Sequence, residues 1–182
     1  MSTFAKAMAD KTEKIVLGGG CFWCIEAIYQ MVRGVNKVTS GYAGKVDEKV
    51  NYYSGNAEVV EVEFDPSIIT LENIFAVFFT AHDPTSLNKQ GADTGAQYRS
   101  VILYTTEEQK IEAEKFMKKL VEEKVYAKPI VTDLELLEKF HEAENYHQNY
   151  YEQNKDVNPY CQVVIDPKIT KIRQSFAHLI NK

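Results

Sequence analysis

The sequence predicts an α+β fold, a single two-layer domain in which helices pack on a mixed sheet with βαβ elements. Apolar runs rich in β-branched residues alternate with segments of helical periodicity, in the order strand, helix, strand, strand, helix, loop, strand, helix. The chain has 182 residues, 45% of them hydrophobic, and no repeat or linker divides it. We expect one domain over residues 14–182, preceded by a flexible extension at residues 1–13.

Only glycines separate the first strand from the first helix. Residues 14–17 form a short apolar run that is typical of a buried strand. Apolar residues then recur at helical spacing from residue 25, including Ile25, Ile28 and Val32. The three glycines at residues 18–20 permit a tight turn. Cys21 is therefore predicted at or near a helix N-terminus.

Two strands and a capped helix follow. Residues 35–44 indicate a strand that runs into a loop, and residues 58–64 alternate apolar and charged side chains, as in a strand with one wet face. Thr70 is predicted to cap a helix over the apolar residues from 71 to 78. Residues 82–98 contain almost no aliphatic side chains, and loops of this length are usually functional.

The C-terminal part predicts three strands and three helices. We expect strands at residues 99–104, 129–132 and 161–165. Helices are expected from Thr106 to about residue 125, within residues 142–151, and over residues 168–180. The apolar side of the first of these helices is assigned to Ile111, Phe116 and Leu120.

Composition excludes several classes of partner. A net charge of −5 argues against nucleic acid and anionic membranes. The longest apolar run, residues 74–81, is far shorter than the roughly 20 residues of a membrane span. No secretory signal precedes the three cysteines, so a disulfide framework is not expected and the cytoplasm is the predicted location.

Cys21 and Cys24 form a C-x-x-C pair at the predicted turn from strand to helix. The helix start is expected to lower the pKa of Cys21 and make it a nucleophile. Cys24 is either a second redox thiol or a small buried side chain. A zinc site formed by these two cysteines, Cys161 and a histidine would lack a second C-x-x-C or H-x-x-x-H pair, so no metal is expected.

Aromatic and acidic side chains complete the candidate site. Phe22 and Trp23 stand between the two cysteines, and at least one is predicted to line an apolar pocket. Glu58 begins a strand; its position alone favours a solvated charge at the strand end, whereas burial beside a pocket would raise its pKa and suit it to general-acid catalysis. Asp93 and Tyr98 are candidates by their place in residues 82–98. The histidines are interpreted as structural, His82 as the residue that holds the turn at residues 83–84; the others are His141, His147 and His178.

Several separated motifs resemble the A-type peptide methionine sulfoxide reductases over residues 15–180. They are Gly20-Cys21-Phe22-Trp23, Gly41-Tyr42-Ala43-Gly44, Ala57-Glu58-Val59-Val60, His82-Asp83-Pro84-Thr85, Asn88-Lys89-Gln90-Gly91, Asp93-Thr94-Gly95, Gln97-Tyr98-Arg99-Ser100 and Tyr146-His147-Gln148. Two features depart from the family pattern. The loop ahead of Glu58 is shortened, with Asn56 in place of a histidine, and the C-terminal tail lacks a glycine-rich stretch with a further cysteine.

The resemblance implies a ferredoxin-like core and a catalytic domain over residues 14–182. It implies thiol-dependent reduction of methionine-S-sulfoxide, free or in oxidised proteins, with thioredoxin as reductant and no cofactor. Cys21 would attack the sulfoxide sulfur and become a sulfenic acid, and Glu58 would protonate the oxygen. Tyr98 and Tyr53, or Tyr52 in its place, would donate hydrogen bonds. Asp93 would shape the polar side of the pocket, and its apolar side would be formed by Phe22 and Trp23.

The resolving thiol is expected to be Cys161, with Cys24 as the alternative. Family members mostly resolve with a C-terminal cysteine, and Cys161 follows a predicted turn at residues 158–159. Two other functions stay open from the residues alone. A thioredoxin-like disulfide oxidoreductase would use Cys21 and Cys24, with Pro129 as a candidate cis-proline. A binding module for oxidised methionine would have lost catalysis.

Overall fold

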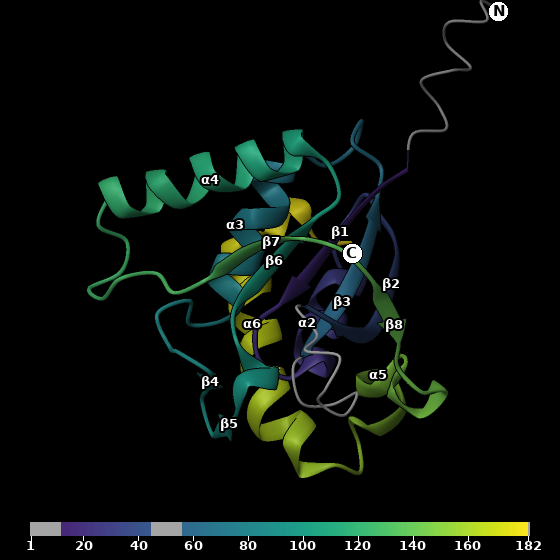
Figure 1. The fold of residues 1–182 in the computed structure, drawn as a ribbon. Helices are drawn as coiled ribbons and strands as arrows, with labels where there is room; N and C mark the ends of the chain where they lie inside the picture. Colours follow the sequence, from purple (N-terminus) through teal and green to yellow (C-terminus); the bar gives the residue numbers. More distant parts are fainter. Residues whose placement is uncertain (1–11, 45–55, 182) are drawn as a thin grey trace, which may run out of the picture.

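A six-stranded mixed sheet forms the centre of the protein, as seen in the computed structural model, which describes residues 12–44 and 56–181 (Figure 1). Tyr52, Tyr53 and the first 11 residues of the predicted extension lie outside the described residues. The strand order is β7-β6-β1-β3-β2-β8, and the one parallel pair among these described strands is β6–β7. The strands are β1 (Glu13–Gly18), β2 (Val35–Ala43), β3 (Ala57–Phe64), β6 (Val101–Tyr104), β7 (Asp133–Leu136) and β8 (Phe140–Glu142).

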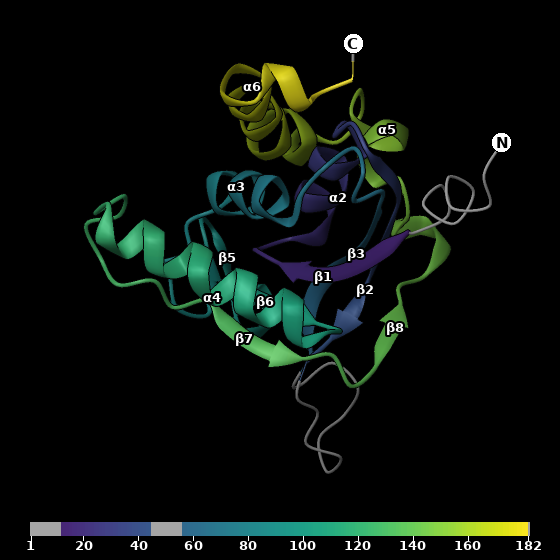
Figure 2. The same cartoon turned by 90° about the horizontal axis from the view of Figure 1, so that it is seen from above.

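Helices pack on one face of this sheet, as the view from above makes clear (Figure 2). They are α2 (Phe22–Gln30), α3 (Leu71–Ala81), α4 (Glu107–Glu122), α5 (Tyr150–Asn154) and α6 (Asp166–Ser175). Thr70 caps α3 through its side-chain oxygen, as predicted, and Thr106 caps α4 in the same way. No helix in the described part of the chain combines the length and the apolar character needed to cross a membrane.

The order of the strands decides where the reactive residues lie. Strand β3 is inserted between β1 and β2, and β1 is inserted between β3 and β6, so the crossovers through α2 and α3 each skip one strand, whereas α4 joins the neighbouring strands β6 and β7. Because β1 and β3 are antiparallel, with Leu17 opposite Val60, the end of β1 lies beside the start of β3. Cys21 follows β1 and Glu58 begins β3, so both side chains reach the same edge of the sheet.

The core divides between the two faces of the sheet. Val60, Val62 and Phe64 of β3 point toward the helices, and all three are fully buried. The alternate positions Ala57 and Val59 belong to a smaller cluster on the opposite face, which Leu137 and Phe140 cover. The predicted alternation of β3 is therefore confirmed, but its outer face is wet only toward the C-terminal end.

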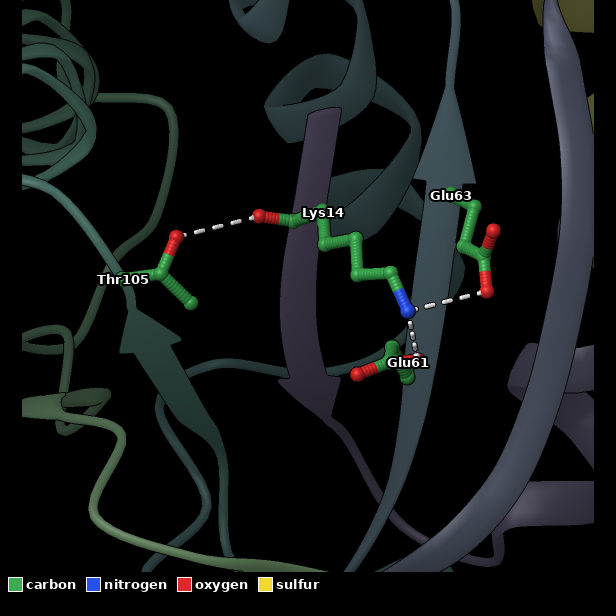
Figure 3. A network of polar contacts seen from close by, with 4 residues as sticks. All are labelled: Lys14, Glu61, Glu63 and Thr105. Atoms are coloured by element: carbon green, nitrogen blue, oxygen red, sulfur yellow. Dashed lines mark hydrogen bonds and ion pairs between the residues drawn. The ribbon is translucent and has the colours of Figure 1, made fainter. Parts of the chain in front are cut away.

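That wet end carries a small network of charges (Figure 3). Lys14 Nζ lies 2.9 Å from Glu61 Oε1 and 3.1 Å from Glu63 Oε1, and Thr105 Oγ1 donates a hydrogen bond to the Lys14 carbonyl at 3.4 Å. The Lys14 side chain is 48% exposed, so these ion pairs contribute little to the free energy of unfolding.

The predicted strand at residues 161–165 is wrong. Cys161–Ile165 forms a π-helical turn that continues directly into α6, with Cys161 and Ile165 buried and Val163 73% exposed. Buried positions four residues apart are the spacing of a helix, and three β-branched residues in this short segment obscure that period. The predicted helix at residues 142–151 is also too long, since only Asn145–His147 and the start of α5 are helical there.

Two smaller differences concern the edge of the sheet. The strand predicted at residues 129–132 begins instead at Asp133, where β7 pairs with β6. Strand β8 was not expected, and it pairs with β2 so closely that a Cβ at Gly41 would lie 2.4 Å from the Phe140 ring. Ile111 of α4 is 52% exposed, so it does not share the buried side of the helix with Phe116 and Leu120.

Candidate functional site

Cys21 occupies the N-cap position of α2, at the end of the turn that the sequence predicts. Gly20 makes this turn with φ of +92°, and a Cβ there would lie 2.7 Å from the Gln90 side chain, so the position requires glycine. The Cys21 carbonyl accepts the Cys24 N–H at 3.1 Å and begins the helix. Cys21 itself is only 7% exposed, so the residue has little contact with solvent.

The Glu58 carboxylate lies directly beside the start of α2. Its Oε2 accepts a hydrogen bond from the Phe22 N–H at 3.2 Å. Burial raises the pKa of Glu58 to about 7, and the negative charge of Asp93 adds to this rise. Glu58 therefore carries a proton for much of the time at neutral pH, which is what a general acid needs.

The thiols of Cys21 and Cys24 are close neighbours at the first turn of α2. This contact raises the pKa of Cys21, and burial and the nearby Glu58 raise it further. The same contact lowers the pKa of Cys24 to about 7. The expectation that the helix start lowers the pKa of Cys21 is therefore wrong, because Cys24, burial and the nearby Glu58 outweigh the helix terminus.

Aromatic rings form a wall next to the two thiols. Phe22 packs against Tyr42 at 5.5 Å and His147 at 5.0 Å between ring centroids. Trp23 stacks on Tyr150 with 3.6 Å between centroids and 4° between planes. The Trp23 Nε1–H donates to His147 Nδ1 at 3.0 Å, so His147 joins both aromatic residues of the predicted pocket.

A cavity of about 260 Å³ lies beside this wall and the Glu58 carboxylate. Its size suits the end of one amino-acid side chain. The lining combines apolar rings with polar groups, an arrangement that can orient a small polar head. The lining residues are Tyr42, Asn56, Glu58, Gln97, Glu144, Tyr146 and His147.

Asp93 and Tyr98 also lie close to the reactive groups. Asp93 Oδ2 accepts a hydrogen bond from the Tyr160 hydroxyl at 2.8 Å, and that hydroxyl is 4.0 Å from Cys24 Sγ. Burial raises the pKa of Tyr98, and the charges of Glu58, Asp93 and Cys21 raise it as well. Its hydroxyl therefore stays protonated and available as a donor at neutral pH.

Some residues of this site were not anticipated. His147, interpreted as structural, lines the cavity, and Tyr150 and Tyr160 complete the wall around Trp23. Only the short Tyr146-His147-Gln148 motif pointed to this region of the chain. His82 does not hold the turn at residues 83–84; it is buried, with ring nitrogens 2.7 Å from the Phe78 carbonyl and 2.7 Å from Ser100 Oγ.

Cys161 is fully buried and lies near Cys24, whose negative charge raises the Cys161 pKa after the larger effect of burial. All three cysteines are free thiols. Over residues 12–44 and 56–181, no three His, Cys, Asp or Glu side chains group closely enough to hold a metal ion. The peptide bond before Pro129 is trans, so the cis-proline of the thioredoxin-like alternative is not found.

The chain is similar to known proteins in both sequence and fold. The family model described as peptide methionine sulfoxide reductase matches residues 13–180. The peptide methionine sulfoxide reductase MsrA of Chromobacterium violaceum is 48% identical over 174 residues, which span 92% of this chain and 98% of that protein. Mxr1 of Saccharomyces cerevisiae in reduced form is a similar structure, with a TM-score of 0.74 and 31% identity over 81% of this chain and 88% of that one.

Mxr1 is also similar in its complex with Trx2, with a TM-score of 0.58 and 26% identity over 75% of this chain and 84% of that one. By sequence and by fold, the chain belongs to the peptide methionine sulfoxide reductase family.

Proposed function

We propose that the protein reduces the S epimer of methionine sulfoxide, both free and within oxidised proteins, with Cys21 as nucleophile and Glu58 as general acid. One observation carries this proposal: the buried Glu58 carboxyl accepts the Phe22 N–H at 3.2 Å beside Cys21 and has a pKa of about 7. An acid that is protonated near neutrality and lies next to a thiol can deliver a proton to the departing sulfoxide oxygen.

The first step oxidises Cys21 by two electrons and reduces methionine sulfoxide to methionine. Cys21 sulfur forms a bond to the sulfoxide sulfur while Glu58 gives its proton to the oxygen and takes up the thiol proton. The sulfur–oxygen bond of methionine then breaks, the hydroxyl passes to Cys21, and methionine leaves. Tyr98 would donate a hydrogen bond to the oxygen. Tyr53, or Tyr52, has the same proposed role but lies outside the described residues.

The aromatic wall would receive the methyl group of the substrate. Trp23 is partly exposed and presents apolar surface next to Cys21, Phe22 packs against it at only 2% exposed, and the neighbouring cavity of about 260 Å³ has Glu58 on its polar side. Asp93, held by the Tyr160 hydroxyl, shapes that polar side. This division orients the methyl and the oxygen in opposite directions, which is how a chiral sulfur centre is distinguished.

The second step would convert the Cys21 sulfenic acid to a disulfide and release water. Cys24 is the neighbouring thiol with the largest influence on Cys21, so it would capture the sulfenic acid first. Cys161 would then attack Cys24 by thiol exchange, which transfers the disulfide to Cys24 and Cys161 and frees the Cys21 thiol. Thioredoxin would reduce this disulfide, and the Trx2 complex of the similar Mxr1 supports that choice.

The proposal also covers the core topology, the extent of the domain, and the cellular location and cofactor requirement. The unit β1-α2-β2-β3-α3-β6, with strand order β6-β1-β3-β2, would be the ferredoxin-like core of the family. Residues 14–182 would form one catalytic domain after a flexible extension. The mechanism needs three free thiols, which suits the reducing cytoplasm, and it requires no organic cofactor or metal because thiols supply the electrons.

The first prediction tests the reaction itself. With dithiothreitol as reductant, the wild-type protein is expected to convert the S epimer of methionine sulfoxide to methionine and leave the R epimer. Cys21→Ser should abolish turnover and keep the circular dichroism spectrum of the wild type. Reduction of unrelated disulfides without sulfoxide turnover would favour the thioredoxin-like alternative, and binding without turnover would favour a binding module.

A second prediction concerns the acid. Glu58→Gln keeps the size of the side chain but cannot give up a proton, so methionine release in a single turnover should slow by about 10² to 10⁴-fold. Glu61→Gln, on the wet face of the same strand, is the control and should react at the wild-type rate. An unchanged rate for Glu58→Gln would remove Glu58 from the mechanism.

The pKa of Glu58 also predicts how stability changes with pH. The folded pKa is raised to about 7 from 4.5, so folding favours the protonated form and stability should fall as pH rises from about 4.5 through about 7. In thermal melts, Glu58→Gln should be more stable than the wild type at pH 8, and this advantage should shrink by pH 4. An equal advantage at both pH values would contradict a raised pKa.

The order of the thiols is tested by mass spectrometry after one equivalent of substrate without reductant. Tryptic peptides 15–33 and 156–168 contain Cys21 with Cys24 and Cys161, respectively. The wild type should link the two peptides through Cys24 and Cys161, whereas Cys161→Ser should accumulate a disulfide within peptide 15–33. A Cys21–Cys161 link formed by Cys24→Ser at the wild-type rate would show that Cys161 captures the sulfenic acid directly.

A further inference from the structure

We propose that Glu26 is a positioning residue for the aromatic wall: its buried carboxylate holds the backbone of Asn149 and Tyr150 so that the Tyr150 ring stacks on Trp23. The inference rests on the proposed function, since it assigns Glu26 a part in binding the sulfoxide. It concerns a side chain that neither touches the reacting atoms nor takes part in the thiol chemistry.

Glu26 lies inside the protein among apolar side chains. It is 1% exposed and lies in α2, where the neighbouring positions Ile25 and Ala27 are also buried. A carboxylate in such a place costs stability unless it is hydrogen-bonded. Its Oε1 accepts the Asn149 N–H at 2.7 Å and its Oε2 accepts the Tyr150 N–H at 3.2 Å. Both oxygens are thus used to bind one short segment of backbone.

That segment has an unusual shape. Asn149 adopts left-handed backbone angles, with φ of 54° and ψ of 36°, directly before α5. The residue before Asn149 is Gln148, and its side chain ties it to the sheet. This side chain hydrogen-bonds the Ser40 N–H and carbonyl at 2.9 Å each and the Ala143 carbonyl at 3.0 Å. Glu26 is the side chain that fixes the following two residues to α2.

Two of the rings that contact Trp23, those of His147 and Tyr150, flank these anchors. His147 accepts the Trp23 Nε1–H at 3.0 Å, and Tyr150 stacks on the indole at 3.6 Å. The Tyr150 hydroxyl accepts a hydrogen bond from Asn158 Nδ2 at 2.8 Å, so Tyr150 is held at its backbone by Glu26 and at its far end by Asn158. Without the Glu26 contacts, the ring would keep only the second of these supports.

Glu26 and Trp23 are three residues apart on α2, so they lie on the same side of the helix. One turn of helix therefore sets both the indole and, through Glu26, the ring that stacks on it. The acid is supported separately, by the Phe22 N–H to Glu58. Loss of Glu26 should consequently weaken substrate binding and leave the proton transfer intact.

The test uses Glu26→Gln in the full chain, because Gln cannot offer two acceptor oxygens to the two N–H groups. Trp23 is the single tryptophan among the 182 residues, so its fluorescence reports directly on the stack. The emission maximum should shift, KM for methionine-S-sulfoxide should rise about tenfold, and kcat should stay within about twofold, in line with the loss of hydrogen bonds to a charged group. Glu63→Gln, on the far face of β3, should change none of these values.

A double-mutant cycle separates positioning from general destabilisation. Tyr150→Leu removes the stacked ring and should itself raise KM. If Glu26 acts through Tyr150, then Glu26→Gln in the Tyr150→Leu background should raise KM by less than about twofold more. Additive effects on KM would overturn the proposal, as would a folded Glu26→Gln protein with the wild-type KM.

If Glu26→Gln does not fold, Glu26→Asp keeps the charge but shortens its reach, and a folded Glu26→Asp protein with wild-type emission and KM would overturn the inference. If the wild type itself shows no turnover, the proposed function fails. In that case an unchanged Trp23 emission in the Glu26 variant overturns the positioning role as well, and a shifted emission supports it.

Discussion

The antiparallel pairing of β1 with β3 is the constraint on which the site depends. With Leu17 opposite Val60, the turn after β1 and the first residues of β3 must meet at one edge of the sheet. This pairing brings Cys21 and Glu58, the proposed nucleophile and acid, to the same helix start although they are 37 positions apart in the sequence. It also buries Glu58 between two strands and a helix, and that burial gives the carboxyl its proton near neutrality.

The rest of the site is supplied by segments that the sheet does not position. Asp93 comes from the short ribbon of β4 (Lys89–Gln90) and β5 (Asp93–Thr94), whereas His147, Tyr150 and Tyr160 come from the chain beyond β8. These segments are tied to the core by polar contacts, including those of Gln148 with Ser40. The proposed chemistry is thus placed at the ends of β1 and β3, whereas the proposed binding surface comes mostly from the chain beyond β8.

Sequence periodicity predicted the elements whose one face is buried and whose other face is polar. The strand at Glu58, the helix behind Thr70 and the turn into α2 all follow from that pattern. It failed at Cys161–Ile165, where β-branched side chains concealed a helical spacing. It also could not give the pKa of Cys21, because that value depends on Cys24 and Glu58 in three dimensions rather than on the helix start alone. His147 was missed for the same reason, since its role comes entirely from a partner 124 positions away.

The near-complete burial of Cys21 has a consequence for the proteins that this enzyme repairs. A cysteine that is only 7% exposed is reached most readily by a side chain that extends well beyond its own backbone. A methionine sulfoxide packed in a core or held flat on a helix cannot extend in this way. The pace of repair in a folded client is therefore governed by how often the client's own chain opens locally around the damaged residue. Oxidised methionines in loops and frayed ends are restored first, and those in stable cores wait for their host to unfold.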